Sequence, residues 1–516
     1  MQTPARSFAP AIAASAALSA AFVPAFFSGG FFDTPRLVTA ICVWAVLAVV
    51  FAVAHRPWPR TRAQAIAVSG LAGLAIWTLA SVSWAPIAGR AEDDAQRIVL
   101  YLGLLLLGLV ALRPPAARSW LEPTLLVGLI TVCAVGLSER LLPDLVQLER
   151  SQTAAGRLEQ PLTYWNGMGL VAAWAWLVGA RLAGDATRSR RLRTIAASTL
   201  PVAGLTLYLT FSRAGIAAAV AGTVVLAALS PYARSQLAAL TVGGVATAVA
   251  AMVANRLPTV RSLEPGTVGN PDHGHLMLAV LVALSAVCAL ATWFSRSRPA
   301  QGSRSVPVKR AALVAGVTLV ALIAAAIAAA VSDVRPSSES PVRGATPERL
   351  QSIDTNRYAY WKAAIEMAKR EPLRGEGAGS FAAVWRARPK RPDRAVDAHS
   401  LYLETVAELG IVGAAALLSF LGGVISGALG ALRRHPTAAI GPLAVLVSWL
   451  VHAGVDWDWE LPGATAPALL ASAALLAWSE PDRRARTSAE PLGAQRAVDA
   501  EARARRRMSA TGARSS

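Results

Sequence analysis

Cysteine is scarce in this sequence, and its placement excludes two classes of protein. The three cysteines, Cys42, Cys133 and Cys288, all lie in apolar runs. Isolated cysteines without a CxxC pair predict neither a disulfide framework nor a zinc site. We therefore expect buried, unpaired thiols that pack as small hydrophobic groups. No metal site is predicted.

Nucleic-acid-binding motifs are also absent, although the net charge is +19. The basic residues lie in short segments between apolar runs and in the C-terminal tail, which is the distribution that membrane topology produces. A nucleic-acid-binding protein would add a recognisable motif to its positive charge. We therefore expect no nucleic-acid partner.

Apolar residues, by contrast, are abundant. They make up 54% of the chain, and the mean hydropathy is +0.45, too high for an ordinary soluble enzyme. Apolar runs of about 16–24 residues recur along the chain, roughly the length that a helix needs to cross a bilayer. No alternating strand pattern is present, so helices must satisfy the backbone in lipid. The sequence predicts an all-α polytopic membrane protein with about 12–14 transmembrane helices.

Basic residues recur in alternate loops, which predicts the topology. The opposite loops are acidic or mixed, as in Glu92-Asp93-Asp94 and Asp456-Trp457-Asp458. The positive-inside rule therefore places both termini in the cytoplasm. The predicted spans begin near residues 9, 37, 65, 98, 120, 166, 194, 214, 237, 275, 311, 408, 437 and 464.

Four regions follow from this topology. Residues 1–331 form the first part of the transmembrane bundle, and 332–400 form one large extracytoplasmic loop carrying short helices. Residues 401–480 contribute the last transmembrane helices, and 481–516 form a disordered basic cytoplasmic tail. The loop has more Lys and Arg than Asp and Glu. This excess fits either a solvated surface or an anionic substrate, because long loops escape the charge rule.

The loop contains an amphipathic helical pattern from Asp354 to Arg370, with Tyr358, Trp361, Ile365 and Ala368 on one face and Arg357 one turn before Trp361. A glycine-rich run from Gly375 to Gly379 follows this helix. Nucleotide-binding loops follow strands, so this run predicts instead a turn that brings the backbone close to another segment.

His399 lies near the start of the next helix, which Asp397 or Ser400 begins. The helix dipole disfavours an imidazolium at that end, so the ring is expected to be neutral and able to accept a proton. Glu404 and Glu408 share a face of this helix, and they are either catalytic groups or polar contacts.

Arg213 falls at a tight link between two predicted spans on the non-cytoplasmic side. An ionisable residue at such a turn is either functional or reaches the lipid headgroups. Arg213, Arg357 and His399 are all predicted outside. Two guanidiniums suit a lipid pyrophosphate, and a neutral imidazole could take the proton of an acceptor hydroxyl. We expect the three to converge in one outer cavity.

These motifs are ones that the chain shares with a known family: it resembles the O-antigen ligase family of membrane glycosyltransferases, which includes polysaccharide polymerases. The similar segments are Ser212-Arg213-Ala214-Gly215, Arg357 with Trp361, Pro372-Leu373-Arg374-Gly375-Glu376-Gly377, and His399 with Tyr402-Leu403-Glu404, with weaker similarity at His452 and Asp456. The chain departs from the family at Ser400, where the family often has asparagine, and in its larger number of predicted spans.

The resemblance implies transfer of a glycan from undecaprenyl pyrophosphate to an acceptor hydroxyl, on the outer face of the cytoplasmic membrane, without a metal or other cofactor. It implies that Arg213 and Arg357 bind the pyrophosphate, with Arg374 and Trp361 as further substrate-binding residues, and that His399 acts near the acceptor. The expected partners are a lipid-linked oligosaccharide donor, a glycan, lipid or protein acceptor, and membrane lipids.

Three alternatives stay open at this stage. The chain is either a ligase or a polymerase of the same family. A metal-dependent enzyme that uses a polyprenyl-monophosphate sugar would employ acidic outer loops such as Glu92-Asp93-Asp94. A transporter or flippase of lipid-linked glycans would instead need charged or broken helices near mid-membrane.

Overall fold

Every regular element in the described part of the chain is a helix, which confirms the all-α prediction. The computed structural model describes residues 4–53, 59–295, 344–351, 356–388 and 393–481. The first elements are α1 (Pro4–Phe22), η1 (Val23–Phe26), η2 (Ser28–Gly30), α2 (Asp33–Val53), α3 (Arg62–Ser81), α4 (Ala88–Leu112), α5 (Ala117–Leu141) and α6 (Trp165–Gly184). Then follow α7 (Arg190–Ser198), α8 (Leu200–Leu209), α9 (Arg213–Leu229), α10 (Ala233–Arg256), α11 (Pro258–Arg261) and α12 (Pro271–Phe294). The last are α14 (Glu348–Gln351), α15 (Arg357–Arg370), α16 (Phe381–Ala387), α17 (Leu401–Arg434), α18 (Pro436–Ala453), η3 (Asp458–Glu460) and α19 (Pro462–Trp478).

The described helices confirm a polytopic membrane protein. Ten of them are long and apolar enough to span a bilayer, and three shorter apolar helices accompany them, at Pro10–Phe26, Arg213–Leu229 and Pro462–Trp478. Each coincides with a predicted span. The span predicted near residue 311, and the predicted tail from residue 482 onward, lie outside the described residues.

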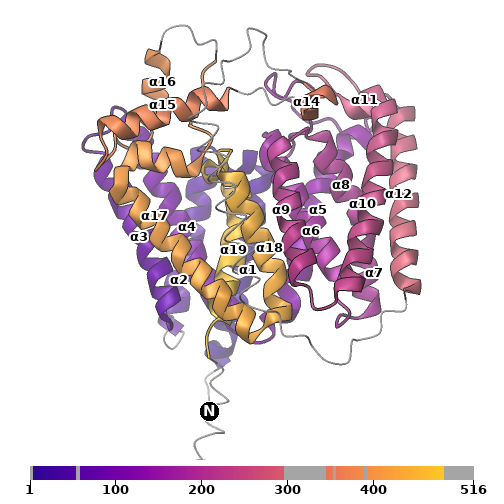
Figure 1. Ribbon diagram of the computed structural model, residues 1–516, viewed down its shortest axis with the longest axis horizontal. Coiled ribbons are helices and arrows are strands. Elements are labelled where there is room, and N and C mark those ends of the chain that lie inside the picture. Colours follow the sequence, from indigo (N-terminus) through magenta and orange to yellow (C-terminus); the bar gives the residue numbers. More distant parts are fainter. Residues whose placement is uncertain (1–3, 54–58, 296–343, 352–355, 389–392, 482–516) are drawn as a thin grey trace, which may run out of the picture. The chain divides into compact units, whose positions relative to one another are not determined.

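Two helices form the centre of the bundle. All residues of α19 are buried, and α6 is buried except for Trp165 and Trp176. A helix that is apolar and buried on all sides belongs to the interior of a helical bundle. α19 packs against α1, α4, α17 and α18, and α6 packs against α5, α8 and α9 (Figure 1).

α3 and α17 cross at close range, because glycines let the two backbones approach. A Cβ added to Gly70 would lie 2.3 Å from the Phe420 nitrogen, and one added to Gly423 would lie 2.4 Å from the Ala67 nitrogen. Small residues at a crossing permit this approach and the dispersion contacts that hold helices together in lipid. Either glycine therefore fixes the position of α17.

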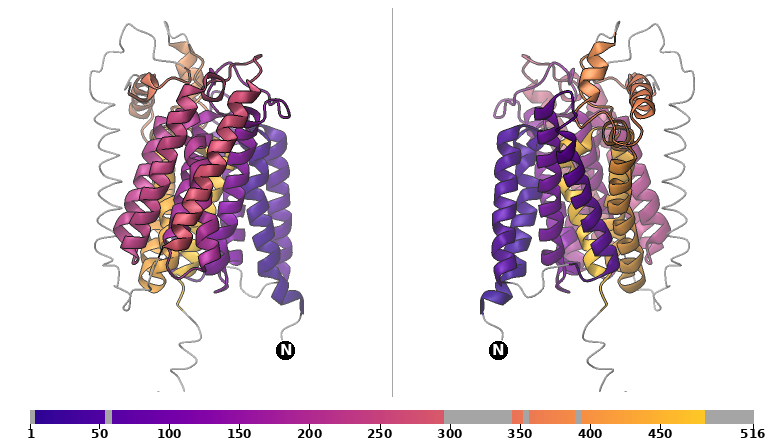
Figure 2. Two further views of the ribbon diagram at one scale, coloured as in Figure 1. Left: turned by 90° about the vertical axis from the view of Figure 1, so that its right-hand side faces the viewer. Right: turned by 90° about the vertical axis from the view of Figure 1, so that its left-hand side faces the viewer.

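α15 and α16 cover one end of the bundle, above the first turns of α17 (Figures 1 and 2). α15 begins close to its predicted start, and it packs against α17 through a face that includes Tyr360, Trp361 and Met367. The predicted face contained Tyr358 and Ile365, which are only partly buried. The helix turns its smaller alanines, Ala363 and Ala364, inward, because α17 lies directly beneath it.

The prediction of a loop at Glu92-Asp93-Asp94 is wrong, because α4 begins at Ala88 and includes these residues in its first turns. The sequence interpretation started the helix at the apolar run near residue 98. Ion pairs compensate the acidic turns: Arg36 contacts Asp93 at 2.8 Å, and Arg97 contacts Asp94 at 2.7 Å.

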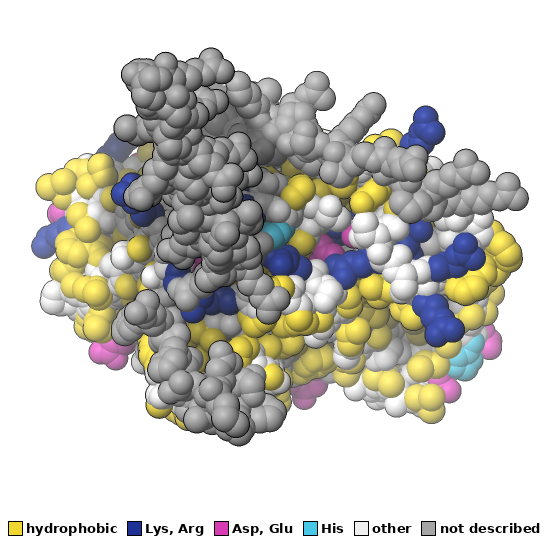
Figure 3. Space-filling model, turned by 90° about the horizontal axis from the view of Figure 1, so that it is seen from below, with side chains coloured by type: hydrophobic (Ala, Val, Ile, Leu, Met, Phe, Trp, Pro, Cys, Tyr) yellow, Lys and Arg dark blue, Asp and Glu magenta, His cyan; other side chains and the backbone are white. Residues whose placement is uncertain are grey.

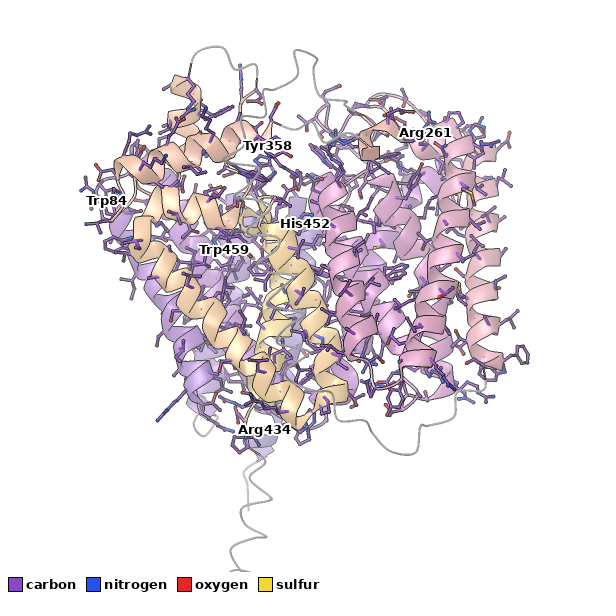
Figure 4. All side chains as sticks on the ribbon, viewed as in Figure 1. Trp84, Arg261, Tyr358, Arg434, His452 and Trp459 are labelled. Carbon is purple, nitrogen blue, oxygen red and sulfur yellow. The ribbon has the colours of Figure 1, made fainter. Side chains whose placement is uncertain are left out.

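The opposite end of the bundle carries exposed arginines, and we call it the basic end. The N-terminus of α5 meets the C-terminus of α17 there, with Arg118 Nη1 2.7 Å from His435 Nε2. Figure 3 views the molecule from this end, and Figure 4 labels Arg434 on it and Tyr358 at the other. The exposed basic residues include Arg190, Arg191, Arg433 and Arg434.

Candidate functional site

A polar cavity of about 420 Å³ opens at the end of the bundle away from the basic end. It lies where the segment between α5 and α6, the start of α9, α14, α15 and the residue before α17 meet. Three of the predicted site residues, Arg213, Arg357 and His399, line it together. The lining residues are Gln152, Thr153, Ala155, Arg157, Tyr164, Trp165, Asn166, Arg213, Arg349, Asn356, Arg357, Tyr360 and His399.

Four arginines face this cavity, and no carboxylate is among its described lining residues. Arg213 is the first residue of α9, where the Ser212 hydroxyl caps the helix by accepting the Gly215 N–H at 3.0 Å. Arg349 lies on α14 and Arg357 at the start of α15. Arg157 comes from the segment before α6. The folding of distant parts of the chain thus gathers positive charge in one place.

No motif or local pattern in the sequence singles out Arg157, which is 5% exposed. Its guanidinium lies 3.6 Å from the centre of the Trp165 ring, and Nη2 donates to the Thr153 carbonyl at 2.8 Å. Nη1 is buried and has no hydrogen-bond partner among the described residues. A donor buried without a partner is costly, and an anion in the cavity would supply one.

The crowded cations oppose one another. Burial, followed by the charge of Arg349, lowers the pKa of Arg157 to about 9. Burial, followed by Arg213 and then Arg357, lowers the pKa of Arg349 to about 10. Both guanidiniums remain charged at neutral pH. An anionic ligand would relieve this repulsion.

Arg357 is held by a buried carboxylate beneath the cavity. Its Nη2 donates to Asp456, which also accepts a hydrogen bond from the Tyr164 hydroxyl and is fully buried. Burial raises the pKa of Asp456, but the charge of Arg357, with smaller contributions from His452, His399 and the Tyr164 hydroxyl, lowers it overall. Asp456 therefore stays ionised and orients the Arg357 guanidinium.

His399 directly precedes Ser400, which is the N-cap of α17. The Ser400 hydroxyl caps the helix by accepting the Leu403 N–H. The His399 backbone has a φ of 54°, and the ring Nδ1 lies 3.0 Å from the Asp397 carbonyl oxygen. A carbonyl can only accept, so Nδ1 carries the hydrogen and Nε2 is left as the acceptor. Burial lowers the pKa of His399 below its ordinary 6.5. The low pKa keeps the ring neutral, as expected, and burial is the largest contribution to this shift.

The other two predicted substrate-binding residues do not line the cavity. Trp361 contacts the backbone of a lining residue instead: its Nε1 donates a hydrogen bond to the His399 carbonyl at 3.4 Å. The side chain of Arg374 is 55% exposed, lies 3.5 Å from Glu371 and stacks over Trp84, with 5.8 Å from its guanidinium carbon to the ring centre. The motif around Arg374 therefore has another role in this region.

That role is to hold the first turns of α17 through hydrogen bonds, and we call this set of contacts the clasp. The Gly377 N–H donates to the Glu408 carbonyl at 2.8 Å, and the Glu408 side chain accepts the N–H groups of Gly379 and Phe381, each at 2.8 Å. The expected close approach of the glycine run is thus confirmed, with α17 as its partner. Glu408 is a polar contact, and so is Glu404, which accepts the Ala398 N–H at 2.7 Å.

Residues 276–418 match the family model described as O-Antigen ligase. The matched segment includes Arg349, Arg357 and His399, whereas Arg157 and Arg213 lie outside it. No curated protein matches the chain.

Proposed function

We propose, from the match of residues 276–418 to the O-antigen ligase family model, that this chain moves a glycan from undecaprenyl pyrophosphate to an acceptor hydroxyl. The transfer takes place in the arginine-lined cavity, on the outer face of the cytoplasmic membrane, and no step of it requires a metal. The chain is thus a multi-pass membrane glycosyltransferase of the ligase or polymerase type.

The observation that carries this proposal is the meeting of four guanidiniums and one neutral imidazole in a single cavity. Guanidiniums match phosphate oxygens in geometry and stay charged when partly buried. Arg213 and Arg357, together with Arg157 and Arg349, can bind the two phosphates of the donor. They supply the charge stabilisation that a divalent cation supplies in other glycosyltransferases.

His399 then acts on the acceptor. Nε2 takes the hydroxyl proton as the acceptor oxygen bonds to the anomeric carbon of the donor sugar. The bond from that carbon to the pyrophosphate oxygen breaks, and the leaving group carries the electron pair into the guanidinium-lined cavity. The Asp397 carbonyl holds the required tautomer, and Asp456 keeps Arg357 beside the phosphates.

The position of the cavity supports an outer active site. The exposed arginines at the basic end, among them Arg190 and Arg434, fit the positive-inside rule if that end faces the cytoplasm. The cavity lies at the other end, under α14 and α15, in the region predicted as the extracytoplasmic loop at 332–400. The exposed Arg374 beside Trp84 suits a position among lipid headgroups.

Two rival functions have less support. A flippase needs a polar path between the two ends of the bundle, whereas the central helix α19 is buried along its whole length. A metal-dependent transferase using Glu92-Asp93-Asp94 finds no support in the cavity, because none of these residues lines it. Ligation and polymerisation share the same donor chemistry, and the length of the product distinguishes them.

The proposal is tested with protein purified in detergent and supplied with an undecaprenyl-pyrophosphate-linked oligosaccharide and an acceptor glycan. We expect transfer to persist in EDTA at a temperature well below unfolding, with release of undecaprenyl pyrophosphate. A polyprenyl-monophosphate donor is the control and should be inert. Transfer without a second compartment would exclude a flippase. Activity that EDTA abolishes and a divalent cation restores would contradict the proposal.

The pH dependence of transfer should report on His399. Because burial lowers its pKa below 6.5, the ring stays neutral at pH 7, and its base form is lost only as the pH falls through that lowered value. We therefore expect a constant rate from neutral pH down to about 6.5 and a decline below it. An inflection above 6.5 in the pH–rate profile of the wild-type protein would contradict this assignment.

A further inference from the structure

A second polar cluster lies apart from the arginine-lined cavity, and it is acidic. Oxygens of Asp397, Glu404 and Glu460 all lie within 4.8 Å of one another. The three side chains come from separate parts of the fold: the segment before α17, the first turn of α17, and η3. Glu404 and Glu460 also line a small cavity of about 40 Å³, together with Asp94 and Glu408. The described linings of the two cavities share no residue.

Glu460 is the carboxylate whose environment demands a ligand. It is 9% exposed and faces the small cavity, yet it receives no hydrogen bond from another residue that the structure describes. Its backbone is held on both sides, since Tyr101 donates to the Trp459 carbonyl at 2.6 Å and the Ala464 N–H donates to the Leu461 carbonyl at 2.9 Å. The side chain therefore cannot leave the cavity by a small shift of η3.

The neighbouring cations do not balance this charge. Arg97 is buried close to the cluster, but its Nη1 pairs with Asp94 at 2.7 Å. Glu404 and Glu408 each accept N–H groups of other residues, whereas the Glu460 carboxylate is reached only by its own backbone N–H among the described residues. Buried carboxylates that face one another without a cation are strongly unfavourable.

We propose that Asp397, Glu404 and Glu460 bind a divalent cation, with Ca²⁺ as the best fit. Ca²⁺ takes carboxylate oxygens at about 2.4 Å, so two ligands on opposite sides of the ion lie up to about 4.8 Å apart. The three oxygens already lie within that limit. Mg²⁺ demands near-ideal octahedral geometry at about 2.1 Å and usually keeps several waters, whereas Ca²⁺ accepts an irregular set of carboxylate oxygens.

The ion would join three segments that otherwise meet through like charges. It takes no part in group transfer, because neither Glu404 nor Glu460 lines the arginine-lined cavity. The proposal therefore concerns the stability of the folded chain and does not depend on the proposed function.

The test is thermal unfolding of the full-length protein in detergent, followed by tryptophan fluorescence, after EDTA treatment and gel filtration. With Ca²⁺ at about 1 mM, a site of extracellular affinity or tighter should raise Tm by about 3 °C or more. Glu460→Gln should lose this response while unfolding in EDTA at a temperature no lower than the wild type, since it removes a repelling charge. Asp397→Asn should respond less than the wild type.

Asp144→Asn is the matched control, because Asp144 is 43% exposed and pairs with His275 outside the cluster. This variant should keep the full response to Ca²⁺. A shift that sodium chloride of equal ionic strength reproduces, or that Glu460→Gln retains, would overturn the proposal. So would the absence of any shift in the wild type. Transfer activity is not measured, so failure here is distinct from failure of the proposed function.

Discussion

Replacing His399 with alanine is expected to lower the rate of glycan transfer by about 10²–10⁴-fold, the contribution typical of a positioned general base. His399 is the only histidine among the described residues that line the arginine-lined cavity. Its Nε2 is available as an acceptor because the Asp397 carbonyl holds the hydrogen on Nδ1. The measurement is the initial rate of undecaprenyl pyrophosphate release, at saturating donor and acceptor.

A second variant separates chemistry from folding. The backbone of His399 has a φ of 54°, a conformation that asparagine tolerates better than alanine. His399→Asn should therefore fold as the wild type does and still lose transfer. His275→Ala is the control, because His275 is half exposed and pairs with Asp144 at 3.2 Å; its rate should not change. Wild-type rates in a well-folded His399→Asn protein would exclude the role of a base.

Arg213 and His399 could be found from the sequence because each breaks a local rule. Arg213 puts a charge at a tight link between apolar runs, where lipid makes an unneeded charge expensive. His399 lies at a helix start that Ser400 marks as an N-cap. The spans themselves follow from apolar length, which depends on bilayer thickness and not on tertiary contacts. These features are local, so one sequence contains them.

Arg157 and Arg349 could not be found in this way. Arg157 lies in an irregular segment, and what selects it is its stacking on Trp165 and its place beside Arg349, both of which are tertiary. Arg374 is the converse case, since it was predicted to bind substrate but does not line the described cavity. It belongs to a recognisable motif, but the structure assigns the glycines of that motif to the clasp around α17 and leaves the arginine exposed.

Glu460 shows the same limit. The sequence places it in an acidic segment between two spans, where topology alone accounts for negative charge. Its position opposite Asp397 and Glu404 arises only when α17 and α19 pack together. Clusters built from three separate segments have no signature in the spacing of residues along the chain.

The clasp makes Gly410 the position at which one methyl group should do most damage to the fold. Gly410 interrupts α17 with φ 62° and ψ −162°, a region of backbone space that is essentially limited to glycine. A Cβ there would lie 2.3 Å from the Leu373 oxygen and 2.6 Å from the Gly375 nitrogen. Gly410→Ala therefore combines backbone strain of about 1–3 kcal/mol with a clash against backbone that cannot move aside.

We expect Gly410→Ala to unfold at a Tm lower by roughly 5 °C or more, or to fail to accumulate as a monodisperse species in detergent. The effect should reach the site, because the displaced turn carries Glu408, whose carboxylate holds the N–H groups of Gly379 and Phe381. Gly422→Ala is the matched control in the same helix, since a Cβ at Gly422 meets nothing within 4 Å. Alanine is favoured over glycine inside a helix by about 1 kcal/mol, so this control should unfold at the wild-type Tm or slightly above it. Equal Tm values for the two variants would mean that the break in α17 at Gly410 does not require glycine.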